Sequence, residues 1–116
     1  MAYMHKIIGV GMDQMGLKIL FFQVMSDPTR HKILSLLEKR EKMCVNDLVH
    51  GLRISQPTVS KHLALLRHAG LVLAAREGQQ VFYSLNGRKL RSCCTKYFSG
   101  FSCCSDLFSN SDIPDA

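Results

Sequence analysis

The chain has 116 residues, a formal charge of +6 at neutral pH and 47% hydrophobic residues. This length suits a single domain with a modest core and leaves little room for the closed pocket of an enzyme. No stretch approaches the length of a membrane span, and the short N-terminal apolar run at 7–10 lacks the features of a signal peptide. We therefore expect a cytoplasmic protein with no membrane partner and no catalytic activity.

Basic residues are concentrated in the stretch 53–96, where Glu77 is the single acidic residue. Such a concentration is the electrostatic signature of a protein that binds a polyanion. The simple alternative is a solvated basic face, which a DNA-binding motif in the same stretch would argue against. The basic residues are Arg53, Lys61, Arg67, Arg76, Arg88, Lys89, Arg91 and Lys96.

The first predicted elements are two helices that follow an N-terminal arm at 1–13. Residues 14–25 are apolar nearly all round, which suggests a helix that is covered on most sides, as at a subunit interface. Asp27 and Pro28 have the pattern of an N-cap and a first-turn proline, so the second helix should run to about Lys39. A charged connection is expected to follow.

A short helix, a tight turn and a longer helix come next, over residues 44–52, 51–55 and 56–68. Ser55 is placed to act as an N-cap of the longer helix, and Gly70 is placed to end it. The order of these elements is that of a helix-turn-helix.

The longer helix has two faces of different character. Val59, Leu63 and Leu66 recur at helical spacing and should face the core. The opposite face has short polar groups and cations but no acidic residue, which suits a recognition helix in the major groove of DNA. For His62, contact with the DNA backbone or a capping role is preferred to metal ligation. The predicted DNA contacts from this helix are Gln56, Thr58, Ser60, Lys61, His62 and Arg67.

Two strand-like segments, 71–76 and 81–85, are joined by a short loop at 77–80. A hairpin that directly follows a recognition helix is typical of a wing. Its tip should reach the DNA backbone or the minor groove. The predicted contacts there are Arg76 and Gln79, beside Gly78 and Gln80.

The last predicted helix runs from about Arg88 to Phe101 and is amphipathic. Its apolar arc needs a cover, and the natural partner is the first helix of the same or a second subunit. The expected fold class is mainly α with a small β-hairpin: a winged helix-turn-helix over residues 14–105 that dimerises through its first and last helices, with a flexible tail at 106–116. The apolar arc contains Leu90, Cys93, Cys94, Tyr97, Phe98 and Phe101, and Ser92 falls on the polar side.

Five segments together match one known pattern. They are Met-Ser-Asp-Pro-Thr-Arg-His-Lys-Ile-Leu-Ser-Leu-Leu (25–37), Cys-Val-Asn-Asp-Leu (44–48), Ser-Gln-Pro-Thr-Val-Ser-Lys-His-Leu (55–63), Leu-Arg-His-Ala-Gly-Leu-Val (66–72) and Gly-Gln-Gln-Val-Phe-Tyr-Ser-Leu (78–85). With these segments, residues 19–98 resemble the ArsR/SmtB family of winged-helix repressors. The resemblance implies a homodimer that binds a palindromic double-stranded operator without a cofactor and leaves it when a metal ion, metalloid or thiol-reactive signal binds.

The inducer sites of that family match this chain only in part. The family element Cys-Val-Cys-Asp-Leu is similar to 44–48, where Cys44 is present but Asn46 replaces the second thiol. A second family site uses Asp and His at the start of the last helix, with His and Glu further along. The corresponding positions are Gly87, Lys89, Gly100 and Cys103. A zinc or nickel site of that type is therefore not expected, whereas the pairs Cys93-Cys94 and Cys103-Cys104 loosely resemble those of some arsenic-responsive members.

Cysteines in a reducing compartment are expected to be ligands or sensors rather than disulfides. Thiolates select soft ions, so the expected inducer is As(III), with Cd(II), Pb(II), Hg(II) or Cu(I) as alternatives. On a continuous helix Cys93 and Cys104 would lie roughly 16 Å apart. One ion could then bind both pairs only across a dimer or if the chain turns back near Gly100, which can adopt a positive φ. The predicted ligands are Cys93, Cys94, Cys103 and Cys104, with Cys44 as an open case, and simple packing of Cys93 and Cys94 is the alternative.

Two other functions stay open from the sequence alone. The same repressor could respond to oxidation or persulfidation of its cysteine pairs instead of to an ion. A winged-helix protein-interaction module without DNA binding is the alternative of another class. A protein-binding face usually carries an aromatic anchor, which the helix at 56–68 lacks.

Overall fold

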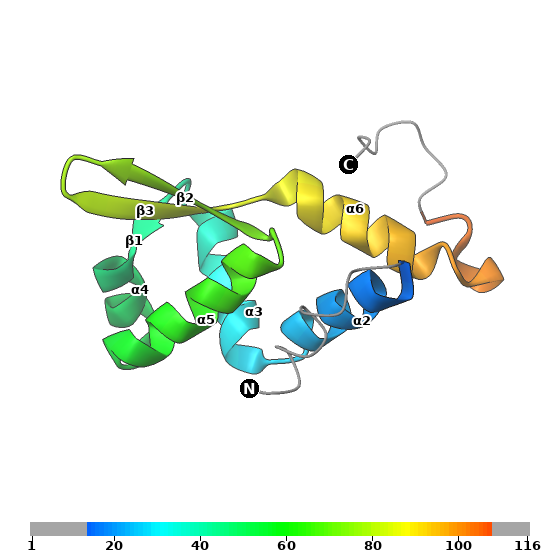
Figure 1. Cartoon of the computed structure of the whole chain (residues 1–116), viewed down its shortest axis with the longest axis horizontal. Helices are drawn as coiled ribbons and strands as arrows, with labels where there is room; N and C mark the ends of the chain where they lie inside the picture. The colour runs from blue at the N-terminus through cyan, green and yellow to red at the C-terminus, as the bar shows by residue number, and fades with distance from the viewer. Residues whose placement is uncertain (1–13, 108–116) are drawn as a thin grey trace. The chain divides into compact units, whose positions relative to one another are not determined.

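The computed structural model describes residues 14–107, which divide into two compact units (Figure 1). The central unit is Gln23–Asn86, and the terminal unit comprises residues 14–22 and 87–107. The predicted arm at 1–13 and most of the predicted tail, 108–116, lie outside the described residues. In the part of the chain that the structure describes, no helix is both long and apolar enough to cross a membrane.

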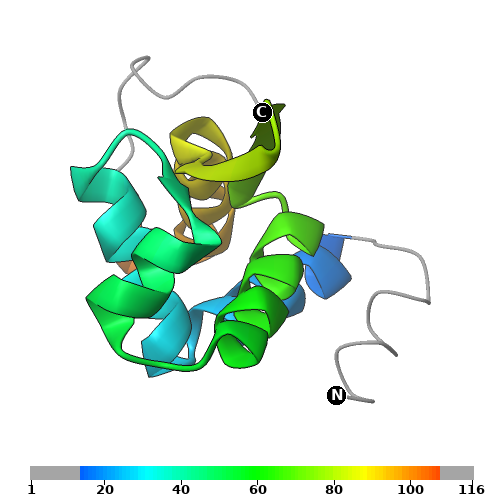
Figure 2. The same ribbon diagram turned by 90° about the vertical axis from the view of Figure 1, so that its left-hand side faces the viewer.

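Helices and a small sheet form the central unit. The last turn of α2 (Gln14–Met25) leads into α3 (Pro28–Lys39), β1 (Met43–Cys44), α4 (Val45–Leu52), α5 (Gln56–His68), β2 (Val72–Glu77) and β3 (Gln80–Leu85). The helices α3, α4 and α5 pack against one another, as Figure 2 shows from the side. Together with the end of α2 and the sheet they enclose the core of the unit, which includes Val24, Ile33, Leu34, Leu37, Met43, Leu48, Val59, Leu63, Leu66, Leu71 and Val72.

Short-range signals set the start of α3 and the end of α5. The Asp27 carboxylate accepts a hydrogen bond of 3.1 Å from the Arg30 backbone N–H, which confirms the predicted N-cap. At the end of α5, Gly70 has a φ of 80°. The Leu71 N–H reaches back to the Leu66 carbonyl at 3.0 Å, as in a Schellman motif. The predicted end of the helix is therefore confirmed.

The wing is longer, and its turn tighter, than the sequence predicts. Strands β2 and β3 pair antiparallel over six residues each, so the turn contains only Gly78 and Gln79 instead of 77–80. Gly78 has a φ of 66°, which a two-residue hairpin turn requires and glycine adopts without steric cost. Strand β1 pairs with the other side of β3, giving the order β1-β3-β2. A two-residue strand is too short to produce an alternating pattern, so the sequence did not reveal it.

The terminal unit contains the first part of α2, α6 (Gly87–Phe98) and the short 3₁₀ helix η1 (Ser102–Cys104). The predicted last helix is confirmed, but it ends at Phe98 and not at Phe101. The Phe101 N–H bonds to the Phe98 carbonyl at 3.0 Å, so the backbone tightens into a turn after α6. The helix is interrupted near Gly100 as expected, but Gly100 does not adopt a positive φ. Among the described glycines, only Gly70 and Gly78 have a positive φ.

Aromatic side chains gather in the terminal unit. The Phe22 ring stacks on Tyr97 with centroids 5.2 Å apart, and Phe98 meets Tyr97 edge-on at 5.0 Å. Phe22 nevertheless remains 56% exposed and Phe101 50% exposed. Ser92, expected on the polar side, is the buried residue of α6. The aromatic side chains of the terminal unit are thus only partly covered within one chain.

Candidate nucleic-acid interface and cysteine pairs

The exposed face of α5 has the character expected of a recognition helix. Val59, Leu63 and Leu66 are at most 1% exposed, so the opposite face is turned to solvent. No acidic residue lies anywhere on this helix to repel phosphates. Short hydrogen-bonding groups allow close approach to base edges, and flanking cations can pair with phosphates. The exposed residues are Gln56, Ser60, Lys61, Ala64 and Arg67, and Thr58 is half-buried.

Ser55 occupies the N-cap position of α5 but does not cap it. Its side chain makes no capping hydrogen bond, so that expectation was wrong. Instead the Ser55 hydroxyl donates a 2.9 Å hydrogen bond to Thr58 Oγ1. The Thr58 oxygen is thereby used as an acceptor, which leaves its own hydroxyl hydrogen to donate to an outside acceptor such as a phosphate.

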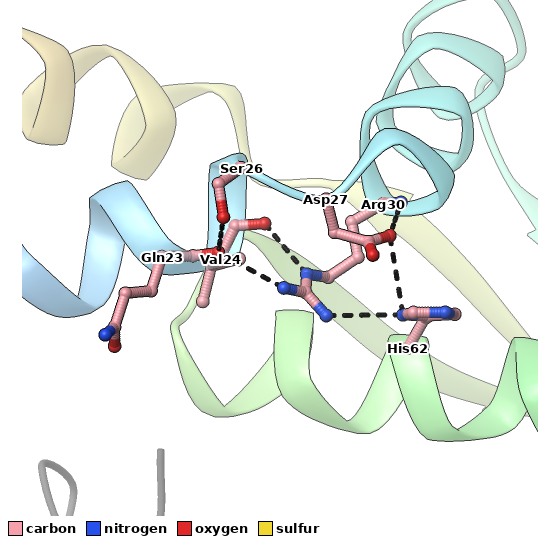
Figure 3. Close-up of polar contacts among 6 residues, drawn as sticks. All are labelled: Gln23, Val24, Ser26, Asp27, Arg30 and His62. Atoms are coloured by element: carbon pink, nitrogen blue, oxygen red, sulfur yellow. Dashed lines mark hydrogen bonds and ion pairs between the residues drawn. The ribbon is translucent and has the colours of Figure 1, made fainter. Parts of the chain in front are cut away.

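His62 lies apart from the other predicted DNA contacts. Its side chain is 16% exposed, and its Nδ1 is 3.3 Å from Arg30 Nη1 and 4.0 Å from Asp27 Oδ2 (Figure 3). Burial, the largest effect, lowers the pKa of His62. This position corrects the expected contact with the DNA backbone or the cap of the helix, because the ring is directed to the start of α3. The helical arc alone could not show this, since Arg30 is 32 residues away.

The acidic residue of the wing is neutralised within the fold. The Lys42 Nζ lies 2.5 and 2.7 Å from the two carboxylate oxygens of Glu77, and 4.9 Å from the centre of the Phe82 ring. Lys42 thus removes a negative charge from the surface that would face DNA. No local pattern in the sequence indicates this pair, because its members are 35 residues apart. The exposed residues around the wing tip are Arg76, Gly78, Gln79 and Gln80.

Asn86 connects the base of the wing to the end of α5. Its side-chain Nδ2 donates to the Gly70 carbonyl at 2.9 Å, and its backbone N–H donates to the Leu71 carbonyl at 2.8 Å. These bonds hold the end of β3 beside the helix terminus. Wing and recognition helix therefore have a defined spacing, a role for Asn86 that its neighbours in the sequence do not indicate.

The cysteine pairs of the terminal unit are free thiols. Cys93 and Cys94 are half-buried on α6, and burial raises the pKa of both. The sulfur atoms of Cys103 and Cys104 are 3.8 Å apart, and their contact raises the pKa of Cys104. Within residues 14–107, no three His, Cys, Asp or Glu side chains converge to hold a metal ion. A single chain in this structure does not bring the two pairs together, so the four-cysteine site stays a prediction.

Cys44 belongs to the central unit, where it links β1 to α4. It is half-buried, and its backbone N–H donates to Asp47 Oδ2 at 3.2 Å. This hydrogen bond is the main reason that the pKa of Asp47 is lowered. Asn46, at the position of the second family thiol, is exposed. A role for Cys44 in inducer binding stays a prediction.

Comparison with known proteins agrees with this geometry. Residues 27–73 match the family described as bacterial regulatory protein, arsR family. The chain is 45% identical over 65 residues to the transcriptional repressor SdpR of Bacillus subtilis, covering 56% of this chain and 71% of that protein. It is 44% identical over 70 residues to the arsenical resistance operon repressor of Escherichia coli, covering 60% of each.

A solved structure has the same fold. The transcriptional regulator HlyU of Vibrio vulnificus superposes with a TM-score of 0.54 at 36% identity, over 58% of this chain and 69% of that one. The chain spans 52–60% of the length of two arsenic-resistance relatives that it matches. Family match, identity and winged-helix architecture together show that the chain belongs to the ArsR family of bacterial regulatory proteins, which are transcriptional regulators and not enzymes.

Proposed function

We propose that this protein is a cytoplasmic, homodimeric repressor that binds a palindromic operator through α5 and the wing and is released by a soft thiophilic ion, As(III). The observation that carries DNA binding is the acid-free, exposed face of α5, with Lys61 and Arg67 among its short polar residues. The wing supports it, because Arg76 and Gln79 are exposed and Glu77 is paired with Lys42. Base contacts would come from Gln56 and Ser60.

Dimerisation is supported by apolar surface that one chain leaves uncovered. Ile19, Phe22 and Phe101 are between 39% and 56% exposed in the terminal unit. Exposed apolar side chains of this kind are typical of a subunit interface. A two-fold dimer would present two copies of α5 to two half-sites, which explains why the operator should be palindromic.

The protonation state of the thiols favours arsenite over divalent ions. Cys93, Cys94 and Cys104 have raised pKa values and are therefore protonated at neutral pH. A divalent ion must displace those protons, which costs affinity. Arsenous acid instead condenses with three thiols, giving As(SR)₃ and three waters, so no net proton is released. Its ligands would come from Cys93, Cys94, Cys103 and Cys104, within one subunit or across the dimer, with Cys44 as a further candidate. The similarity to an arsenical resistance operon repressor agrees with this choice.

A second candidate replaces the ion with thiol oxidation. The 3.8 Å between the sulfur atoms of Cys103 and Cys104 favours it. Peroxide would convert the two thiols to a disulfide and two waters. The raised pKa of Cys104 opposes it, because the thiolate is the reactive form.

The test is operator binding by the full chain, measured by fluorescence anisotropy on its own upstream DNA. Arsenite, Cd(II) and peroxide are added separately. For an allosteric repressor we expect arsenite to weaken binding by about 5–150-fold. Replacing Cys93, Cys94, Cys103 and Cys104 by serine should leave operator affinity intact and abolish the arsenite response, because the ion acts only through its preference for the DNA-free state.

Cys44→Ser is tested separately, since Cys44 is the further candidate ligand and lies in the other unit. Loss of the response in this variant would add Cys44 to the ligand set. Normal release by arsenite from the four-serine variant would overturn the thiol site, and release by peroxide alone would favour the redox candidate. A wild-type chain that binds no DNA under any condition would overturn the repressor proposal itself.

A further inference from the structure

Arg30 is the buried charged residue of the central unit, at 6% exposed. Its guanidinium group makes three contacts (Figure 3). Nε donates to the Val24 carbonyl at 2.8 Å and Nη2 to the Gln23 carbonyl at 3.1 Å, both in the last turn of α2. Nη1 lies 3.3 Å from His62 Nδ1 on α5. One side chain therefore connects the end of α2 to the recognition helix.

The third contact requires a neutral histidine. A guanidinium group has donors and no acceptor, so His62 Nδ1 must accept, with the ring proton on Nε2. A protonated ring would place an N–H against an N–H and two positive charges within hydrogen-bonding distance. Asp27 Oδ2 is 4.0 Å from Nδ1 but already accepts the Arg30 backbone N–H at 3.1 Å. It can offset this repulsion only in part.

The charged groups that act on the ring are few. Asp27 and Arg30, at the start of α3, act with opposite sign, and Lys61 on α5 itself adds to the effect of Arg30. Among the described residues, α4 and β2, which also pack on α5, contribute no charge that acts on His62. Burial is the largest influence and also favours the neutral ring. Neutral His62 is thus the form that the folded state selects.

We propose that Arg30 is a positioning residue for DNA binding: it holds α5 against the last turn of α2 only while His62 is neutral, so that acidification weakens operator binding. This inference rests on the proposed DNA binding by α5. It goes beyond an inducer site, because its signal is a proton and its groups lie entirely within the central unit.

The direction in which operator affinity changes with pH distinguishes the Arg30–His62 contact from general electrostatic attraction to DNA. Because the pKa of His62 is lowered in the folded protein, the contact is complete above the ordinary histidine value of 6.5 and is lost as the pH falls through the lower folded value. Added positive charge on the exposed surface would instead strengthen binding to the DNA phosphates. A decrease in affinity on acidification therefore identifies the His62 contact.

The experiment measures operator affinity of the full chain from about pH 7.5 to about pH 5.5, where histidine titrates. The wild type should lose affinity by about tenfold, since a hydrogen bond to a charged group contributes on this order. His62→Gln keeps an acceptor for Arg30 without a titrating ring, so it should bind normally at the higher pH and lose the acid-induced decrease. His68→Gln, on the exposed side of the same helix, is the control and should retain it. Arg30→Lys keeps the charge but not the planar fork, and should weaken binding at both pH values.

Nitrogen-15 NMR of the His62 ring in the DNA-free wild type provides a readout that needs no variant. The Nε2–H tautomer should dominate at neutral pH, and Arg30→Met should raise the pKa of His62, because a nearby cation is removed. An Nδ1–H tautomer, or equal pH dependence in the wild type and His62→Gln, would overturn the inference. Absence of DNA binding at every pH would instead contradict the proposed function. The contact between Arg30 and His62 would then be tested by the tautomer of the His62 ring alone.

Discussion

The helices α5 and α6 are nearly equal in length, but their apolar faces are buried to different extents. In α5 the face of Val59, Leu63 and Leu66 is fully buried by other elements of the same chain. In α6 the aromatic side chains are half-buried, and the buried residue is the small Ser92. Amphipathic spacing thus predicts that a face will be covered, but it does not say whether the cover comes from the same chain.

The polar faces differ as well. On α5 the exposed groups are short and the cations are few, so the helix can approach a surface closely. On α6 the polar side has four long basic residues, Arg88, Lys89, Arg91 and Lys96, which is the usual composition of a solvated face. Basic charge and the absence of acidic residues are thus common to both helices, and the short polar side chains on the exposed face are what favour α5 as the recognition helix.

The largest effect is expected from a charge placed in the partly covered apolar face of α6. Tyr97→Glu removes the stacked ring partner of Phe22 and leaves a carboxylate in the proposed interface. An uncompensated buried charge costs about 3–5 kcal/mol, so we expect monomers with very weak operator binding. Light scattering at micromolar concentration measures the mass. Lys96→Glu, on the exposed side of α6, should remain dimeric. A monomeric wild type would contradict the proposed interface.

Truncation of the α5 face should destabilise the chain itself. Leu66→Ala deletes a side chain that is 0% exposed and should lower the free energy of unfolding by about 2–5 kcal/mol. The residues that cover Leu66 lie within the same unit, so this loss of stability should not depend on protein concentration. In an α6 variant such as Leu90→Ala, the loss of stability should depend on protein concentration. Chemical denaturation at two concentrations tests this. Equal concentration dependence in both variants would remove the distinction between the two helices.

Smaller effects are expected on the exposed side of α5. Gln56→Ala and Ser60→Ala should each reduce discrimination between operator and random DNA by about 1–3 kcal/mol, because each loses a base contact. Lys61→Ala should weaken binding to all sequences and reduce the salt slope by about one unit. Lys96→Ala on α6 serves as the comparison and should change neither quantity. If the α5 variants bind like the wild type, α5 is not the recognition helix.

The smallest effect concerns the wing. Lys42→Ala removes an ion pair whose side chains are 45% and 48% exposed, so stability should change by less than about 1 kcal/mol. Operator affinity should fall more noticeably, since Glu77 would then face the phosphates unpaired. Lys42→Ala combined with Glu77→Gln should restore affinity. Failure of the double variant to recover would show that Lys42 acts in some other way.

Local signals in the sequence determined most of the fold. The bounds of α2, α3 and α5 were predicted correctly, because capping by Asp27, termination at Gly70 and the apolar spacing of Val59 and Leu63 act within a few residues. The faces of α5 follow from the same spacing. The absence of acidic residues on this helix is also a property of the sequence alone, and together with the short polar face and the helix-turn-helix order it predicts DNA as the partner.

Tertiary structure decided what depends on partners far apart in the chain. Lys42 neutralises Glu77 and Asn86 holds the wing to α5, and His62 turns to Arg30 instead of to solvent. Strand β1 forms only by pairing with the free edge of β3. Hydrogen bonds and ion pairs require atoms within a few ångströms of one another, whereas residue spacing predicts proximity only along one helix or strand. These long-range contacts therefore form only when the chain folds around its core, and no local pattern of residues indicates them.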